Sequence, residues 1–526
     1  MSPESSGISE SRRARSPYAH AANGSNSRFD ITAEVTPASR LGAIHFIAIG
    51  GAGMSGVARV MLARGLTVTG SDAKESLVLA ALVVEGAQVH VGHDAAHLGD
   101  ADTVVISSAI REDNVELQEA RSRGLRVLHR SQALASVMQG CRKVAVAGAN
   151  GKTTTTAMLV VALQHCGVDP SFAVGGELAK HGTNAHHGSG DIFVVEADES
   201  DGSFLVYRPD VAIVTNVQPD HLDFYGTFEA VQAAYATFAA TVQPEGLLVT
   251  CLDDQGSRDL LEVARAAGTR VVTYGLAPDA DVQLTDIESV GLHAHAQLSR
   301  AGGDKAGRTA IGLLEIGMPG RHNLLNATAA FLAATEGLGQ DPARVLAGLA
   351  GFTGTRRRFE PKGQEAGVRV VDDYAHNPGK VAAVVETASV LAAPGRLIVV
   401  FQPHLYSRTR DFAAELATAL SPADIVLVMD VYAAREDPMP GVSGALITDR
   451  LADLPRSSSL GDNVYFVPSW SGVAPLVTQI ARAGDLVLTV GAGDVTMIGP
   501  EILRLLSDRP DAPAVDPAVD PAAGPG

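Results

Sequence analysis

The sequence predicts an α/β protein made of three consecutive blocks, each with a largely parallel sheet covered by helices on both faces. Three observations support this prediction. The chain has 526 residues, which is too many for one hydrophobic core. Short apolar, β-rich runs alternate with helical segments along most of its length. The 54 glycines suit many tight turns between strands and helices.

Composition and charge narrow the functional classes. The formal net charge of −18 argues against a nucleic-acid partner. No apolar run is long enough to cross a bilayer, and the N-terminal segment lacks the apolar core of a secretory signal. Cys141, Cys166 and Cys251 are scattered and form no CxxC pair, so neither a disulfide framework nor a cysteine metal site is expected. We expect a cytoplasmic protein without membrane insertion.

The first block covers residues 41–140 and follows a tail, residues 1–40, that is predicted to be disordered. Its expected elements are a strand at 43–49, a helix at 54–64, and strands at 66–69, 103–106 and 126–128.

A glycine-rich turn follows the first strand of this block. Gly51, Gly53 and Gly56 form a GxGxxG motif, and Asp72 ends the next strand about 20 residues later. Taken alone, this pattern indicates a dinucleotide such as NAD. The turn accepts any pyrophosphate, however, and the aspartate accepts any ribose hydroxyl, so a UDP-sugar fits equally well. A tight turn without a ligand is the third interpretation.

The second block covers residues 141–355 and contains a phosphate-binding loop. A strand at 143–147 leads into a turn at 148–151, and a helix at 153–165 follows. Backbone N–H groups of this turn would converge at the positive end of the helix, where Lys152 adds a charge and Thr153 a hard oxygen for Mg²⁺. Two residues separate the glycines instead of the usual four, so this is a shorter variant. The alternative is a glycine turn with a solvated lysine.

Two later strands of the block, at 192–195 and 211–215, end in polar clusters. The first cluster holds Glu196, Asp198, Glu199 and Asp201; the second holds Asn216, Asp220, His221 and Asp223. Since ligands collect at the carboxyl ends of parallel strands, both clusters should lie beside the phosphate loop. We expect Glu196 and His221 to face metal ions. The alternatives are an acidic surface loop and a structural histidine.

The rest of the chain is expected to complete two more sheets. A strand at 247–250 extends the second block, and residues 270–316 read as antiparallel strands that decorate it. The third block, residues 356–506, has expected strands at 368–371, 397–401, 425–429 and 486–490. Residues 507–526 are rich in proline, alanine and aspartate and should be disordered.

These motifs together resemble the Mur ligases. The segments that resemble the family are, in order, HFIAIGGAGMSGVA, GSD, AGANGKTTTT, EADESDGSF, TNVQPDHLD, GRHNLLNATAA, RRRFE, DDYAHNP, FQPHLYSRT and VGAGD. The resemblance runs from about residue 41 to residue 506. It implies a Rossmann-like N-terminal domain, a central P-loop ATPase domain and a Rossmann-like C-terminal domain. Among the branches, the sequence is most similar to the one that joins L-alanine to UDP-N-acetylmuramate with ATP and Mg²⁺.

The resemblance also implies roles for individual residues. Catalysis would fall to Lys152, Glu196, His221 and His376, and metal binding to Thr153, Glu196 and His221. ATP would be bound by Gly148, Ala149, Asn150, Gly151, Lys152, Thr153, Thr154, His322, Asn323, Arg358, Asp372 and Asp373. The UDP-sugar would be bound by Gly51, Gly53, Met54, Ser55, Asp72, Ser107, Ser108, Thr183, Asn184, Ser200 and Asp201. Tyr374, His376, His404 and Arg408 would bind the amino acid, the arginine through its carboxylate.

The sequence departs from this branch at a few positions. Asn150 stands where histidine is usual, and Gln218 where glutamate is common. Asn377, Gly379 and Lys380 replace the usual histidine, threonine and glutamate. No lysine occurs between His221 and Glu245, where several relatives carry a carbamylated one, and this favours the alanine-adding branch.

The implied reaction has two steps, an acyl phosphate forming first and the alanine amine attacking it second. The resemblance further implies that the C-terminal domain closes over the site, and we expect a monomer or weak dimer.

Three competing hypotheses remain. The first is another ligase of the superfamily, such as a murein-peptide ligase or a folate-polyglutamate synthetase. The second is an NAD-dependent oxidoreductase, and the third is a catalytically inactive UDP-sugar sensor. The oxidoreductase leaves the GKT loop unexplained, and Lys152, Glu196 and His221 argue against the sensor.

Overall fold

The computed structural model describes residues 34–178, 182–302, 307–434, 436–454 and 463–509. The chain divides into two compact units. The first comprises residues 1–288, 295–316 and 323–352, and the second comprises residues 289–294, 317–322 and 353–526. Most of the two predicted tails, residues 1–40 and 507–526, lies outside the described residues. Within the first tail, residues 38–40 form a short 3₁₀ turn, η1 (Ala38–Arg40). No helix among the described residues is long and apolar enough to cross a membrane.

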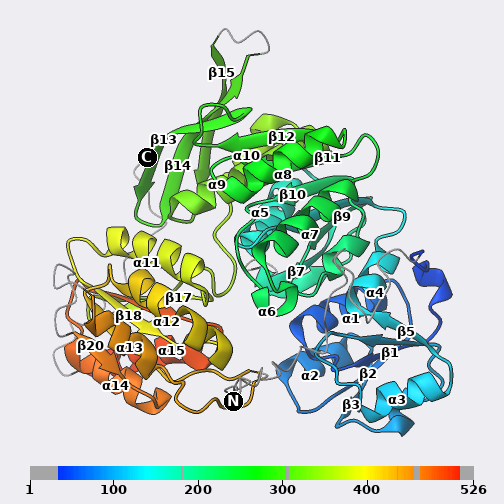
Figure 1. Ribbon diagram of the computed structural model, residues 1–526, viewed down its shortest axis with the longest axis horizontal. Coiled ribbons are helices and arrows are strands. Elements are labelled where there is room, and N and C mark those ends of the chain that lie inside the picture. The colour runs from blue at the N-terminus through cyan, green and yellow to red at the C-terminus, as the bar shows by residue number, and fades with distance from the viewer. Residues whose placement is uncertain (1–33, 179–181, 303–306, 435, 455–462, 510–526) are drawn as a thin grey trace, which may run out of the picture. The chain divides into compact units, whose positions relative to one another are not determined.

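The first sheet lies in the first unit and is wholly parallel (Figure 1). Its part of the chain consists of β1 (Ile44–Ile47), α1 (Ala52–Ala63), β2 (Val68–Asp72), α2 (Leu77–Val84), β3 (Gln88–Val91), η2 (Ala95–Leu98), β4 (Thr103–Ile106), α3 (Val115–Ser122), β5 (Arg126–His129) and α4 (Arg130–Val137). The strand order is β3-β2-β1-β4-β5. The order reverses between β1 and β4, and in such sheets the loops that leave the two strands at this point form the ligand crevice.

The second sheet has ten strands and lies in the first unit, apart from residues 289–294 where β13 meets β14. Its first part consists of β6 (Arg142–Ala147), α5 (Lys152–His165), β7 (Ser171–Leu178), β8 (Thr183–His186), β9 (Ile192–Glu196), η3 (Ser203–Val206), β10 (Val211–Val214), α6 (Leu222–Tyr225) and α7 (Phe228–Ala240). Its second part consists of β11 (Leu247–Cys251), α8 (Gln255–Ala266), β12 (Arg270–Gly275), β13 (Val282–Val290), β14 (His293–Ala301), β15 (Arg308–Ile316), α9 (Arg321–Leu332), a π-helical turn η4 (Ala333–Gly337) and α10 (Pro342–Ala350).

Parallel strands form the centre of this sheet, whose order is β15-β14-β13-β12-β11-β10-β6-β9-β7-β8. The prediction of antiparallel strands from residue 270 onward is wrong for the first of them, because β12 pairs in parallel with β11. Strand β13 is parallel to β12 as well. The change of direction comes at the two-residue connection between β13 and β14, which is too short for a parallel crossover. Figure 1 shows β13, β14 and β15 at the edge of the sheet.

The third sheet lies in the second unit, in the order β16-β17-β21-β18-β19-β20. Its elements are β16 (Glu360–Glu365), β17 (Val368–Asp373), α11 (Pro378–Ala392), β18 (Leu397–Phe401), α12 (Tyr406–Leu420), β19 (Ile425–Val428), α13 (Ala445–Ala452), β20 (Val464–Phe466), α14 (Trp470–Ile480), β21 (Leu486–Val490), η5 (Asp494–Met497) and α15 (Ile498–Ser507). Only β16 is antiparallel to its neighbour among these described strands. The predicted α/β class with three largely parallel sheets is confirmed, and the domain boundaries at 140/141 and 355/356 stay predictions.

A buried carboxylate ties together the first sheet. Glu116, at the start of α3, is fully buried and accepts a hydrogen bond from the Ser71 hydroxyl at 2.6 Å. The ring nitrogens of His93 and His97 lie 3.0 and 3.3 Å from its oxygens, and that of His45 lies at 3.7 Å. Burial opposes ionisation, but the nearby His45 and the hydrogen bonds with Ser71 and His93 lower the pKa of Glu116 to about 2.

We predict that Glu116→Gln destabilises the first unit near neutral pH. A pKa lowered from 4.5 to about 2 corresponds to about 3 kcal/mol of stability. Because the folded-state pKa is depressed, this stability is present above pH 4.5 and is lost as the pH falls toward 2. Calorimetric unfolding should therefore show a deficit for the variant that shrinks below pH 4.5. Glu119→Gln, on the same helix but in a more exposed pair with Arg123, serves as the control. Equal deficits in both variants would contradict the prediction.

Candidate functional site

The phosphate loop joins β6 to α5 and is packed against the end of β10. Gly148 and Gly151 have backbone φ angles of 134° and 88°, which L side chains rarely adopt. A Cβ at Gly148 would lie only 2.0 Å from the Thr215 hydroxyl, so the close approach of the loop requires glycine there. Helix α5 begins at Lys152, and its first backbone N–H groups form the kind of helix N-terminus that binds anions.

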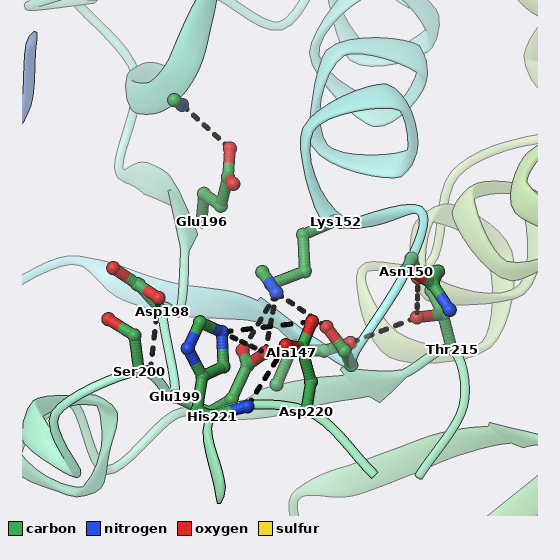
Figure 2. A network of polar contacts seen from close by, with 12 residues as sticks. Ala147, Asn150, Lys152, Glu196, Asp198, Glu199, Ser200, Thr215, Asp220 and His221 are labelled. Atoms are coloured by element: carbon green, nitrogen blue, oxygen red, sulfur yellow. Dashed lines mark hydrogen bonds and ion pairs between the residues drawn. The ribbon is translucent and has the colours of Figure 1, made fainter. Parts of the chain in front are cut away.

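The Lys152 ammonium is held inside this loop by a buried carboxylate (Figure 2). Its Nζ donates to the Gly148 carbonyl at 2.6 Å and lies 2.8 Å from both oxygens of Glu199, a residue that is only 2% exposed. Burial opposes the charged form of Lys152, but Glu199 and neighbouring carboxylates raise its pKa above the ordinary value. The lysine is therefore charged and lies beside the N-terminus of α5.

Thr153 and Glu196 meet on the other side of the loop. The Thr153 hydroxyl donates to Glu196 Oε1 at 3.0 Å, and Glu196 Oε2 accepts from the Gly175 backbone N–H at 2.6 Å. Glu196 is the last residue of β9, whereas Thr153 is in the first turn of α5. Thr154 follows it and is buried in the helix. The expected proximity of the phosphate loop to the carboxyl end of the next strand is therefore present.

His221 lies apart from Glu196, on the side of Lys152 where Glu199 lies (Figure 2). It has a left-handed φ of 54°, and its Nε2 lies 3.6 Å from Glu199 Oε1 and 3.9 Å from Asp220 Oδ2. The carboxylate that approaches both Lys152 and His221 is thus Glu199. The sequence prediction placed Glu199 in the acidic cluster but gave it no role. Its position three residues after Glu196 was the signal available.

The residues around this loop fit a metal ion that would be coordinated by both protein oxygens and phosphate oxygens. Among the described residues, no three His, Cys, Asp or Glu side chains converge as a complete metal site. Mg²⁺ usually takes only one or two protein oxygens and fills its shell with water and substrate phosphates. The Thr153 hydroxyl and the Glu196 carboxylate are hard oxygens of this kind, 3.0 Å apart beside the helix N-terminus.

Helix α9 approaches the same loop. A Cβ at Gly151 would lie 2.4 Å from the Asn326 Oδ1, so Asn326 packs directly on the loop. Asn326 donates to Asn323 at 3.5 Å, and both side chains are buried. Sequence reasoning named Asn323 but missed Asn326, although the second asparagine follows three residues later on the same helix face. His322 precedes them in the second unit, and burial lowers its pKa to about 4.

A cavity of about 300 Å³ lies in the first unit between the GxGxxG turn and strands β7 and β9. Of the residues predicted to bind the UDP-sugar, Gly51, Gly53, Met54 and Ser107 line it. The lining residues that the sequence prediction did not assign to the UDP-sugar include Arg130, Leu134, Asp198 and Tyr207. These residues come from separate segments of the chain that meet only in the folded unit.

Arg130 is the cation of this cavity. Its guanidinium donates to Asp198 at 2.9 Å and lies 4.0 Å from Asp201. Burial opposes ionisation of Asp198, but Arg130 outweighs it and holds the pKa of this carboxyl well below its usual range. The cavity thus combines a fixed cation, the carboxylates of Glu196 and Asp198, and the backbone of a glycine turn.

The other predicted sugar residues do not line this cavity, and their side chains or N–H groups bond neighbouring protein groups. The Asp72 carboxylate accepts from the Gly50 N–H at 2.9 Å, and the Ser108 hydroxyl donates to Asp201 at 2.6 Å. Asn184 donates to the Ala52 carbonyl at 2.8 Å. The contacts of the remaining three are local: Ser55 donates to Ala52 O, Thr183 to Ala185 O, and the Ser200 N–H to Asp198.

The second unit contains a row of aromatic and imidazole rings. His376 lies 5.2 Å from the Tyr374 ring and 5.4 Å from the His404 ring, and Tyr432 stacks on His404 at 6.0 Å. The His376 Nδ1 lies 2.9 Å from the Tyr374 carbonyl, which can only accept, so Nε2 keeps its lone pair. Burial, together with Lys380 and Arg408, lowers the pKa of His376 well below its ordinary value. Sequence reasoning missed Tyr432.

The predicted charged residues of the second unit have mixed surroundings. Arg358 lies over the Tyr374 ring at 5.2 Å, and Arg408 is in the first turn of α12. Asp372 accepts from Thr489 and Thr496, and Asp373 from the Phe359 and Ala375 N–H groups. Both carboxylates therefore have structural partners, and their role toward ATP stays a prediction. Asn377 caps α11 by accepting from the Lys380 N–H at 2.9 Å.

Comparison with protein families matches three adjacent parts of the chain. Residues 43–142 match the "Mur ligase family, catalytic domain", residues 146–334 the "Mur ligase middle domain", and residues 357–493 the "Mur ligase, glutamate ligase domain". The chain belongs to the Mur ligase family. The three-domain Mur ligase architecture expected from the sequence is thereby confirmed.

Curated relatives of this Mur ligase are similar over almost their whole length. The UDP-N-acetylmuramate–L-alanine ligase of Kineococcus radiotolerans is 54% identical over 481 residues, covering 91% of this chain and 99% of that protein. The enzyme of the same name from Renibacterium salmoninarum is 54% identical over 472 residues, covering 89% and 96%.

Solved structures agree with this similarity. The UDP-N-acetylmuramate–alanine ligase of Thermotoga maritima is 30% identical with a TM-score of 0.72, covering 88% of this Mur ligase and 98% of that chain. A murein peptide ligase from Psychrobacter arcticus is 26% identical with a TM-score of 0.65, covering 89% and 99%.

Proposed function

We propose that this Mur ligase joins L-alanine to the carboxylate of UDP-N-acetylmuramate in peptidoglycan precursor synthesis, converting ATP to ADP and phosphate. The observation that carries the proposal is the phosphate loop, where Lys152 and the Thr153–Glu196 pair lie beside a polar cavity that Glu196 also lines. The 54% identity to curated enzymes of this name supports alanine over other amino acids. We infer a cytoplasmic location, because the reaction needs ATP and the three cysteines form no disulfide. We expect the protein to be a monomer or weak dimer.

We assign the cavity at the GxGxxG turn to the sugar nucleotide. The turn at Gly51 and Gly53 would approach the pyrophosphate, and Arg130 would offset its charge. Asp72 would hold the ribose, although its bond to the Gly50 N–H must then be shared. The muramate carboxylate would lie at the end of the cavity lined by Glu196, nearest to the phosphate loop.

In the first step, the muramate carboxylate attacks the γ-phosphorus of ATP, the bond to the β-phosphate oxygen breaks, and ADP leaves. Lys152 and the backbone N–H groups at the start of α5 would stabilise the charge on the transferred group. Mg²⁺, held by Thr153 and Glu196, would neutralise the phosphate oxygens. His221 is proposed to serve a second Mg²⁺, together with Glu199. Asn323 and His322 would contact the adenine, and Arg358 and Asp372 or Asp373 the rest of the nucleotide.

In the second step, the alanine amine attacks the acyl carbon of the acyl phosphate, and phosphate leaves. The second unit would bind alanine, with Arg408 facing its carboxylate and Tyr374 and His404 forming the walls. The amine must lose a proton before or during the attack. The unprotonated Nε2 of His376 would accept this proton, because its lowered pKa keeps the imidazole neutral at the working pH.

The nearest alternative is a murein-peptide ligase, since a structure of that name shares the whole fold at 26% identity. Phosphate release separates the two. We predict release with UDP-N-acetylmuramate, ATP, Mg²⁺ and L-alanine, and slower release when glycine or serine replaces alanine. Release with an alanyl peptide but not with alanine would favour the alternative. Failure with alanine, glycine and serine would remove the assignment.

We predict that Lys152→Ala abolishes phosphate release while leaving the binding of UDP-N-acetylmuramate within about threefold of the parent protein. The lysine would contact the phosphates of ATP and not the sugar nucleotide, so removing it should cost at least a factor of about 10² in kcat. Calorimetric titration with UDP-N-acetylmuramate measures the binding. Lys362→Ala, which breaks a 2.7 Å pair with Glu360 on β16, is the matched control. Equal loss of turnover and sugar binding in Lys152→Ala would mean that the two sites are wrongly assigned.

We predict that His376→Asn lowers kcat by a factor of about 10² to 10⁴, as expected when a general base is lost. Formation of the acyl phosphate does not need this base. A rapid-quench experiment should therefore show ADP formation in the first turnover at nearly the normal rate, with slow product formation afterwards. Loss of both steps together would contradict the proposed role.

A further inference from the structure

Two of the positions at which this chain departs from its branch lie in direct contact. The side chain of Asn150, in the phosphate loop, donates through Nδ2 to Gln218 Oε1 at 2.9 Å. Gln218, in the loop after β10, donates through Nε2 to Asp254 Oδ1 at 3.0 Å. Asp254 is the N-cap of α8. We infer that Gln218 is a positioning residue that fixes the phosphate loop through Asn150, an inference that rests on the proposed use of ATP.

The backbone of Asn150 is held from the same side as its side chain. Its N–H donates to Asn216 Oδ1 at 2.9 Å. Its carbonyl accepts from the Thr215 hydroxyl at 2.5 Å and from the Asn216 amide at 3.0 Å, as Figure 2 shows for Thr215. Asn150 immediately precedes Gly151, whose left-handed backbone starts α5, and Lys152 comes next. A shift of Asn150 therefore displaces the N–H groups that would hold the phosphates.

The carboxylate of Asp254 sets the direction of the whole chain of hydrogen bonds. A carboxylate can only accept, so the Gln218 amide must turn its nitrogen toward Asp254 and its oxygen toward Asn150. Asp254 is itself fixed, because its other oxygen accepts from the Val217 and Ser257 N–H groups at 2.9 Å. Asn150 Oδ1 has no hydrogen-bond partner in the part of the chain that the structure describes, so the contact with Gln218 alone orients this side chain.

The Asn150 and Gln218 side chains are both uncharged, so Asp254 is the first charged group in this chain of hydrogen bonds. Asp254 is the ionisable group that bonds Gln218, and Asp220 and His221 follow Gln218 in the same loop. A glutamate at position 218 would place a second carboxylate against Asp254 and would need either a proton or a cation at position 150. Asn150 and Gln218 therefore form a matched pair. Histidine at position 150, or glutamate at position 218, should be tolerated only if the other position changes as well.

Titration calorimetry with ADP and Mg²⁺ at pH 6 to 8.5 tests this inference. For Gln218→Glu, we expect ADP affinity to fall at least tenfold at pH 8.5 and to recover toward pH 6, where one carboxylate can take a proton. The KM for ATP should follow the same pH profile. The double variant Asn150→His/Gln218→Glu should return to within threefold of the parent affinity at pH 7. The parent protein should show no such pH profile.

Gln232→Glu is the matched control, because Gln232 donates to Asp259 at 3.2 Å in an exposed contact between α7 and α8. The inference is overturned if ADP affinity depends on pH in Gln218→Glu no differently than in Gln232→Glu. It is also overturned if the double variant binds ADP no more tightly than Gln218→Glu does. If Gln218→Glu does not fold, Gln218→Met replaces it, with an expected pH-independent loss of about fivefold; unchanged affinity would overturn the inference. Failure of the parent protein itself to bind ADP would count against the proposed function instead.

Discussion

The ion pair between Lys152 and Glu199 is the interaction on which the candidate site depends. Both groups are largely buried, and removing either partner would leave an uncompensated charge at a cost of about 3–5 kcal/mol. The pair keeps the lysine charged and directed toward the loop. The hydroxyl of Tyr225, on α6, donates to the Glu199 carbonyl at 2.6 Å, which fixes the position of this residue in its loop.

Parallel strand topology explains why the groups of this site meet. Strands β6, β9 and β10 are neighbours in the second sheet, and all three run in the same direction. Their carboxyl ends therefore deliver the phosphate loop, the acidic segment that starts at Glu196 and the loop that contains Gln218 to one edge. This part of the site could be predicted from sequence, because each motif directly follows an apolar strand. The confirmed Mur ligase architecture rests on the same regularity.

Other parts of the site could not be predicted because they depend on packing between distant segments. Arg130 is a helix-starting residue with no motif around it, and only the folded unit brings it to Asp198, 68 positions later. Asn150 and Gln218 were noted in the sequence as two separate expected departures, and their contact became evident only in the structure. The direction of β12 was wrongly predicted, because a polar alternating segment after residue 280 was extended back to a strand that pairs in parallel with β11.

The segment from Glu196 to Asp201 connects the two proposed nucleotide sites. Glu196 and Glu199 contact Thr153 and Lys152 of the phosphate loop. Asp198 and Asp201, between and after them, contact groups from the first sheet's part of the chain, namely Arg130 and Ser108. Because Glu196 and Asp198 both line the cavity, an acid bound there would lie next to the residues proposed to hold the γ-phosphate. Attack on phosphorus needs the two reacting groups within about 3.5 Å, and this six-residue segment contacts both sites and so links their positions.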